Sequence, residues 1–194
     1  MLPLPFTSPR LTLRRFQRSD AAPMLPLIGD FAIADTTARI PHPYTAQDAD
    51  AFLSMLEADP AKPIACITLT ATSELIGCVG LEPDTHNNRA ELGYWIGRPY
   101  WNQGYASEAA AAMLAHAFTA LRLNKVCAHH YTRNPSSGRV LEKIGMRREG
   151  LLTAHMKRWD RYEDCVAYGL TRAEFLARPP ENPHGSHAAP QALG

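Results

Sequence analysis

The sequence is poor in the residue patterns that mark metalloproteins, redox proteins and nucleic-acid binders. Among its 194 residues there are only four cysteines, Cys66, Cys78, Cys127 and Cys165, and they stand singly among apolar neighbours. A zinc centre or a redox dithiol usually needs a Cys-x-x-Cys pair, so we expect buried free thiols and no metal. The formal net charge is only +1, which gives no general attraction to nucleic acid or to an anionic membrane.

Long apolar runs are missing as well. No stretch approaches the roughly 18 consecutive apolar residues that a membrane-spanning helix requires. Residues 1–9 show no basic segment followed by an apolar one, so they do not resemble a secretion signal. We therefore expect a cytoplasmic protein with one globular domain over residues 9–176, a flexible stretch at 1–8 and a disordered, proline-containing tail at 177–194.

What the chain does contain is a series of short strand and helix patterns. Period-two alternation or β-rich composition predicts strands at 10–16, 64–70, 75–81, 90–96, 126–131, 147–157 and 162–170. Capping residues and helical spacing predict helices after Asp20, after Thr45, at 105–121 and at 134–144, with a loop at 30–44. The short turns between the central strands indicate an antiparallel meander and a mixed α/β fold.

The most informative segment joins a strand to the alanine-rich helix through a tight turn. The first backbone N–H groups of such a helix lack partners and lie at the positive end of the helix dipole, so they can hold a pyrophosphate. Gly104 allows a close backbone approach, and Ala106 keeps the helix start thin. Neither a Walker A motif nor a Gly-x-Gly-x-x-Gly fingerprint is present, which argues against nucleotide hydrolysis and NAD binding.

Four segments together resemble one enzyme family. They are Pro-Arg-Leu-Thr-Leu-Arg at 9–14, Pro-His-Pro-Tyr-Thr at 41–45, the turn around 101–106, and Asn-Pro-Ser-Ser-Gly-Arg-Val-Leu-Glu-Lys-Ile-Gly-Met at 134–146. The chain resembles the GNAT acetyltransferase superfamily from about Pro9 to Leu170, and within it the branch of bacterial ribosomal-protein N-terminal acetyltransferases. Gly104 and Ala106 fit the family's phosphate-loop pattern, whose first position holds Trp101. The resemblance implies a mostly antiparallel sheet of about seven strands flanked by about four helices.

The resemblance also implies an activity and a set of partners. It implies an acetyl-CoA-dependent N-acetyltransferase that uses acetyl-CoA as co-substrate, needs no metal and acts on a primary amine by direct attack in a ternary complex. The expected acceptor is a peptide or protein α-amine. A small-molecule amine (a polyamine, an amino acid or an antibiotic) and a non-catalytic CoA-binding role remain alternatives, and a homodimer is expected to be compatible with the fold.

Carried over by position, the resemblance assigns cofactor-binding residues. Backbone groups of the loop would hold the phosphates, a splayed strand would hold the pantetheine, and one asparagine would contact the cofactor arm. The residues concerned are Asn102, Gln103, Gly104, Tyr105, Ala106 and Ser107 for the loop, Tyr94, Trp95 and Ile96 for the strand, and Asn134 for the arm.

Two residues are candidates for proton transfer. Alternation places Glu91 on one face of an apolar strand, where similar enzymes use a glutamate as a base acting through water, and we expect partial burial to raise its pKa. The plain alternative is a solvated carboxylate or an ion-pair partner of Arg89. Leu141 occupies the position at which many family members carry an acidic tyrosine, so the resemblance assigns the thiolate's acid to Ser137. Its alternative role is a hydrogen bond at a helix terminus.

Several other polar residues are weaker candidates. His129 and His130 are adjacent on a strand and face opposite ways, so we assign them structural roles. Arg39 and His42 in the early loop, with Trp159 and Arg161 in a late turn, are candidates for the acceptor site, because loops often carry specificity. Exposed turn residues of no special function are the alternative.

Overall fold

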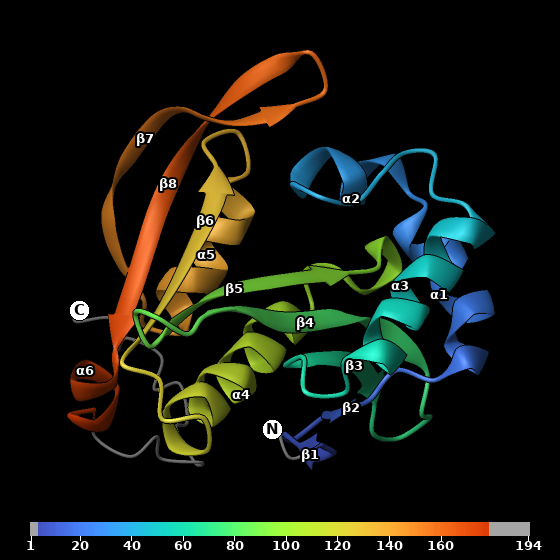
Figure 1. Ribbon diagram of the computed structural model, residues 1–194, viewed down its shortest axis with the longest axis horizontal. Helices are drawn as coiled ribbons and strands as arrows, with labels where there is room; N and C mark the ends of the chain where they lie inside the picture. The colour runs from blue at the N-terminus through green and yellow to red at the C-terminus, as the bar shows by residue number, and fades with distance from the viewer. Residues whose placement is uncertain (1–3, 179–194) are drawn as a thin grey trace, which may run out of the picture.

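The computed structural model describes residues 4–178, and within them eight strands form one sheet in the order β1-β2-β3-β4-β5-β6-β8-β7 (Figure 1). The strands are β1 Phe6–Thr7, β2 Leu11–Arg14, β3 Ile64–Leu69, β4 Leu75–Asp84, β5 Arg89–Ile96, β6 Lys125–Tyr131, β7 Arg147–Arg158 and β8 Arg161–Thr171. The helices are α1 Ala21–Ile28, α2 Phe31–Thr36, α3 Ala46–Ala58, α4 Tyr105–Thr119, α5 Pro135–Lys143 and α6 Arg172–Leu176. Neighbouring strands are antiparallel except β5 and β6, which confirms the predicted mixed, mostly antiparallel fold.

The sheet has an apolar core on each face. On one face α4 and α5 pack around Met113, Phe118 and Leu141, and on the other α1 and α3 enclose Met24 and Trp95 (Figure 1). Successive residues of a strand point to opposite faces, so β5 contributes to both cores. Its odd-numbered side chains face α1 and α3, which matters for the site described below.

The structure has a few elements that the sequence did not predict. β1 lies inside the stretch 1–8 that we expected to be flexible, and its two residues pair with β2. α2 lies inside the predicted loop 30–44, where the Asp30 carboxylate caps it by accepting from the N–H of Ala32 at 2.9 Å. α6 follows β8 directly, and residues 179–194 of the predicted tail lie outside the described residues. In the described part of the chain, no helix has the length and apolarity to cross a bilayer.

The parallel pair β5 and β6 opens like a V. Their register covers only Arg89, Ala90 and Glu91 of β5, although β5 continues to Ile96 and β6 to Tyr131. Beyond Glu91 the two strands diverge, as Figure 1 shows. Each strand there presents backbone N–H and C=O groups with no partner strand on that side, and buried groups of this kind need another partner.

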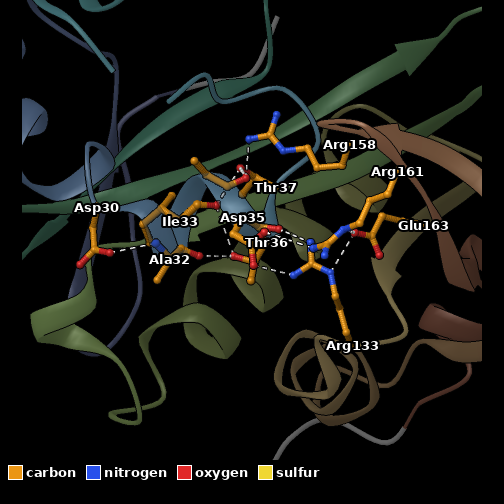
Figure 2. A network of polar contacts seen from close by, with 11 residues as sticks. Asp30, Ala32, Ile33, Asp35, Thr36, Thr37, Arg133, Arg158, Arg161 and Glu163 are labelled. Atoms are coloured by element: carbon orange, nitrogen blue, oxygen red, sulfur yellow. Dashed lines mark hydrogen bonds and ion pairs between the residues drawn. The ribbon is translucent and has the colours of Figure 1, made fainter. Parts of the chain in front are cut away.

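An ionic network holds α2 beside the open ends of these strands (Figure 2). The Asp35 carboxylate of α2 accepts a hydrogen bond from Arg133 at 2.7 Å. Glu163 of β8 is only 6% exposed and accepts from Arg133 at 3.0 Å and from Arg161 at 2.6 Å. The network therefore links three segments that are distant in sequence: α2, the segment after β6 that contains Arg133, and β8.

Arg158, the last residue of β7, also holds α2 and the segment that follows it. It is 7% exposed and donates to the carbonyl oxygens of Ala34 at 2.5 Å, Ile40 at 2.5 Å and Ala38 at 3.3 Å. A buried guanidinium that serves three carbonyls fixes the path of the segment that follows α2. That segment forms one side of the cavity described next.

Arg158→Ala is expected to lower the free energy of unfolding by about 2–4 kcal/mol, because the buried carbonyls lose their charged donor. Urea denaturation would measure the loss, and faster protease cleavage within residues 36–44 would locate it. Arg161→Ala is the matched control, since its side chain is 55% exposed and its removal should cost less than about 1 kcal/mol. Equal stability of Arg158→Ala and wild type would contradict the role given to Arg158.

Candidate active site

A cavity of about 580 Å³ lies where β5 and β6 diverge. It runs from Tyr94 and Ser137 past Glu91 and His129 toward Tyr44 in the segment that leads into α3. Further lining comes from α1, α3, the segment after α2, and strands β3, β4, β5 and β8, including Ile28, Arg39, Ile40, Phe52, Met55, Ile64, Cys78, Gly80, Glu82, Gly93, Trp95 and Cys165. The cavity thus connects the two faces of the sheet through the gap between the strands.

Glu91 and His129 form a pair at the middle of this cavity. Nδ1 of His129 lies 3.2 Å from Oε1 of Glu91, and the two side chains are 17% and 38% exposed, respectively. With its proton on Nδ1 the imidazole donates to the carboxylate and keeps a lone pair on Nε2. The contact joins β5 to β6 across the point where their register ends. The sequence alone predicts only a structural role for His129.

The pKa of Glu91 moves in the direction opposite to our prediction. The hydrogen bond from His129 lowers this pKa more than burial raises it. Electrostatic interactions with Arg39 and His155 lower it further by smaller amounts. The prediction was wrong because it considered the strand alone and could not include a partner from β6. The carboxylate is therefore ionised at neutral pH and well suited to orient an imidazole.

Tyr94 and Ser137 form a second polar pair, at the other end of the cavity. The two hydroxyl oxygens are 2.9 Å apart, and the Tyr94 hydroxyl also lies 3.2 Å from the Ser137 carbonyl oxygen. Burial raises the pKa of Tyr94 to about 12, so the phenol keeps its proton at neutral pH. Leu141, which replaces the family's usual tyrosine, is 1% exposed and belongs to the core.

Backbone donors face the gap between the strands. The N–H of Gly97 bonds to Ile76 of β4 at 2.8 Å, so alternation turns the N–H groups of Tyr94 and Ile96 toward β6. The register with β6 has already ended at Glu91, so these two donors have no strand partner there. Such N–H groups can bind an amide-containing chain or stabilise charge on a carbonyl oxygen.

The predicted phosphate loop has the geometry of an anion site. Asn102 and Gly104 adopt the left-handed φ values of 60° and 82°, and α4 begins at Tyr105. The first bond that closes the helix runs from the N–H of Glu108 to the Gly104 carbonyl, at 3.0 Å. Among the described residues no protein acceptor takes the N–H groups of residues 102–107, so they are available to a pyrophosphate, and the loop fits that group.

The remaining candidates are distributed unevenly. Trp95 and Arg39 line the cavity, whereas Ile96, Asn134, His42, Trp159 and Arg161 are not among its lining residues. Asn134 caps α5, with its side-chain oxygen 3.4 Å from the N–H of Ser137. His130 lies on the other side of β6 from His129, with Nδ1 2.8 Å from the Tyr131 carbonyl oxygen; it also lines the cavity, and its structural role stays a prediction.

Arg39 is held at the cavity edge by Glu82 at 3.1 Å, and both side chains are more than half exposed. Its role in acceptor binding, like that of His42, Trp159 and Arg161, stays a prediction. All four cysteines are free thiols, as predicted, although Cys127 is only partly buried. Within residues 4–178, no cluster of three or more His, Cys, Asp or Glu side chains could hold a metal ion.

Comparison with known proteins identifies relatives of the whole domain. The family described as acetyltransferase (GNAT) domain matches residues 10–147. The uncharacterised N-acetyltransferase p20 of Bacillus licheniformis is 30% identical over 169 residues, which cover 86% of this chain and 95% of the relative.

Solved structures share the fold. An acetyltransferase of the GNAT family from Bacillus anthracis superposes with a TM-score of 0.80 at 26% identity, covering 88% of this chain and 100% of the other. A spermidine N-acetyltransferase from Vibrio cholerae, solved with CoA and spermine, gives a TM-score of 0.76 at 23% identity over 87% of this chain and 99% of the other. Neighbours in this fold therefore bind CoA.

Proposed function

The chain belongs to the acetyltransferase (GNAT) family and is an N-acetyltransferase, and we propose that it transfers the acetyl group of acetyl-CoA to the α-amine of a peptide or protein by direct attack in a ternary complex. The observation that carries the proposal is a single cavity with the Glu91–His129 pair in its middle and the Tyr94–Ser137 pair at one end. A base and an acid placed on opposite sides of one reaction centre are what acyl transfer to an amine requires.

Acetyl-CoA supplies the activated acetyl group, and several residues of this chain are suited to hold it. The free N–H groups of residues 102–107 would bind its pyrophosphate at the start of α4. The N–H groups of Tyr94 and Ile96 face the gap in which the pantetheine arm would lie. One of them would also stabilise negative charge on the thioester oxygen.

The Glu91–His129 pair is suited to accept the proton of the amine. The amine nitrogen forms the new bond to the acetyl carbon, the C–S bond breaks, and one proton leaves the nitrogen. We assign that proton to Nε2 of His129, directly or through one water, with ionised Glu91 holding the Nδ1 proton and stabilising the imidazolium. Glu91 thus keeps a catalytic role, as the partner of the base.

The Tyr94–Ser137 pair is suited to receive the departing thiolate. The phenol of Tyr94 remains protonated and can donate to Oγ of Ser137, which leaves the serine proton free to point at the sulfur. Tyr94 and Ser137 both line the cavity, and Ser137 belongs to α5. Ser137 is thus the proposed acid and Tyr94 the residue that orients it.

The charges of the cavity favour a peptide over a polyamine. A polycation would need a cluster of free carboxylates, yet the three in the lining are already engaged: Glu91 with His129, Glu82 with Arg39, and Asp48 with the N-terminal cap at Thr45. The segments 9–14 and 134–146, which resemble the ribosomal-protein N-terminal branch, support the same class. A small-molecule amine is the second candidate.

Release of free thiol from acetyl-CoA, followed with a panel of N-terminal peptides and a panel of polyamines, amino acids and aminoglycosides, tests this proposal. Mass spectrometry would identify which product gains an acetyl group. Acetylation of small amines alone would overturn the peptide proposal. Binding of acetyl-CoA without transfer to any amine would favour a non-catalytic CoA-binding protein.

Ser137→Ala is expected to lower kcat by about tenfold to a hundredfold with little change in the KM for acetyl-CoA, because it removes an acid used only as the C–S bond breaks. Tyr94→Phe should give a smaller loss of the same kind. Steady-state kinetics with a peptide acceptor would measure both. A rise in the KM for acetyl-CoA at unchanged kcat would instead indicate that Ser137 only binds the cofactor.

A further inference from the structure

We infer that the acceptor carries a bulky apolar side chain next to its amine, so that the preferred substrate is a peptide whose first residue is large and hydrophobic. The inference rests on the proposed function and adds the chemistry of the first residue to it. It is carried by the part of the cavity that lies beyond Glu91, between the sheet and helices α1 and α3.

The cavity floor changes from acidic to apolar along two neighbouring strands. Cross-strand register pairs Glu82 with Glu91, Gly80 with Gly93, and Cys78 with Trp95. Paired residues project from the same face, so the three pairs lie in a row, and all six residues line the cavity. A substrate amine at Glu91 would therefore have its neighbouring group above the glycines, with Cys78 and Trp95 further on.

The middle of this floor is open above β5. A Cβ atom added to Gly93 would meet nothing within 4 Å, whereas one added to the facing Gly80 of β4 would lie 2.8 Å from the Ile64 side chain. Neither glycine has the positive φ that would require glycine for the backbone. The empty space above Gly93 thus belongs to the cavity and is wide enough to take a substituent of the acceptor.

The far end of the cavity is lined by apolar side chains. Trp95 and Cys78 are each 9% exposed, and Ile28 is 4% exposed. Tyr44, Phe52 and Ile64 are partly buried against the same cluster, and burial raises the pKa of Tyr44 to about 12, as expected for a phenol in apolar surroundings. Asp48 and Lys62 also line the cavity, but the Asp48 carboxylate already accepts from Thr45, so a charged or strongly polar substituent would lose its hydration here for little gain.

The distances suit a side chain on the carbon that bears the amine. A strand rises about 3.3 Å per residue, so Gly93 lies roughly 7 Å and Trp95 roughly 13 Å along β5 from Glu91. The side chain of phenylalanine, leucine or methionine would extend toward the space over Gly93, and Trp95 would bound the pocket beyond it. The rest of the peptide would leave by the edge of the cavity near Arg39 and Glu82, which are exposed.

A matched series of peptides that differ only in the first residue (Gly, Ser, Leu, Met, Phe) tests the inference with the full-length chain. The kcat/KM for Phe or Leu is expected to exceed that for Gly by about tenfold to a hundredfold, which is the discrimination that an apolar pocket supplies for a buried side chain. 2-Phenylethylamine, which has the apolar group without the peptide, separates a peptide acceptor from an arylalkylamine. Preference for that amine over the Phe peptide would overturn the peptide part.

Gly93→Leu fills the proposed pocket from its floor. The ratio of kcat/KM for Phe over Gly is expected to fall toward one, while the dissociation constant for acetyl-CoA stays as in wild type. Gly150→Leu is the matched control, because a Cβ there also meets nothing within 4 Å but Gly150 lies on β7 outside the cavity lining. It should leave the selectivity unchanged.

The outcomes distinguish this inference from the proposed function. Acetylation of peptides with equal or better rates for Gly and Ser would overturn the inference and leave the proposed function intact. An unchanged Phe/Gly ratio in Gly93→Leu would place the side chain elsewhere and also overturn it. Absence of transfer to every peptide and amine would overturn the proposed function, and the inference with it.

Discussion

His129→Ala is expected to lower kcat for peptide acetylation at neutral pH by about a hundredfold or more, the usual contribution of a general base. Nδ1 of His129 lies 3.2 Å from Glu91, and both side chains line the cavity. Glu91→Gln should cost less, because the imidazole remains but loses the anion that stabilises its protonated form. Since the two residues act as one unit, the double variant should be no slower than His129→Ala.

The pH profile separates the two members of the pair. The pKa of Glu91 is lowered from 4.5, so its carboxylate is already ionised throughout the neutral range. It therefore cannot cause kcat/KM to change with pH in that range. A rise of kcat/KM with pH in the neutral range would therefore have to come from another group. Its absence in His129→Ala would assign it to the base that Glu91 holds. The limb of the peptide amine itself, near pH 8, is common to all variants.

A His129→Ala enzyme that keeps the rise of kcat/KM with pH and nearly the full rate would contradict the assignment of His129 as the base. Glu91 acting through water would then be the remaining candidate base. His86→Ala offers a control, since His86 is exposed in the turn between β4 and β5 and is not among the residues that line the cavity. We expect that substitution to leave the rate and the pH profile as in wild type.

Gly104→Val is expected to weaken binding of acetyl-CoA by about a hundredfold or more. Gly104 has a φ of 82°, and a β-branched residue in this conformation is strained, so the loop would change path and lose hydrogen bonds to phosphate. Loss of two such charge-assisted bonds would account for about 3 kcal/mol or more. Calorimetric titration of the purified protein with CoA would measure the change.

Gly104→Asn provides the control for strain, because asparagine tolerates the left-handed conformation better than other residues with a Cβ. An added Cβ would have room in the free protein, where its nearest neighbour is the end of the Arg10 side chain at 3.4 Å. Weaker CoA binding by Gly104→Asn at unchanged thermal stability would show that the phosphate itself needs the space. Undiminished CoA binding by Gly104→Val would exclude the loop as the phosphate site.

The strands and long helices followed from local patterns. β5, α4 and α5 were predicted within a few residues, and Gly145, which follows α5, has the left-handed φ of 77° that favours glycine. α2 was missed because six residues with mixed composition give too few turns for a helical period, although Asp30 is a good N-cap. β1 has only two residues and depends on pairing with β2, which no local pattern contains.

The site was predictable where one segment carries it and unpredictable where two segments meet. The loop around Gly104 and the face of Glu91 could be read from a continuous stretch of sequence. The contact of Glu91 with His129 depends on the parallel register of β5 and β6, which are separated by α4. The Tyr94–Ser137 pair is also non-local, since it joins β5 to α5. The sign of the Glu91 pKa shift followed from the first of these contacts.

Gly93 has an evolutionary consequence. Its missing side chain faces open space and its backbone does not require glycine, so the fold itself places little restriction on this codon. A side chain that appeared here by mutation would change which amines are acetylated long before it endangered folding. Diverging copies of such a gene could therefore acquire new acceptors through one position, with the proton-transfer residues and the phosphate loop left as they are.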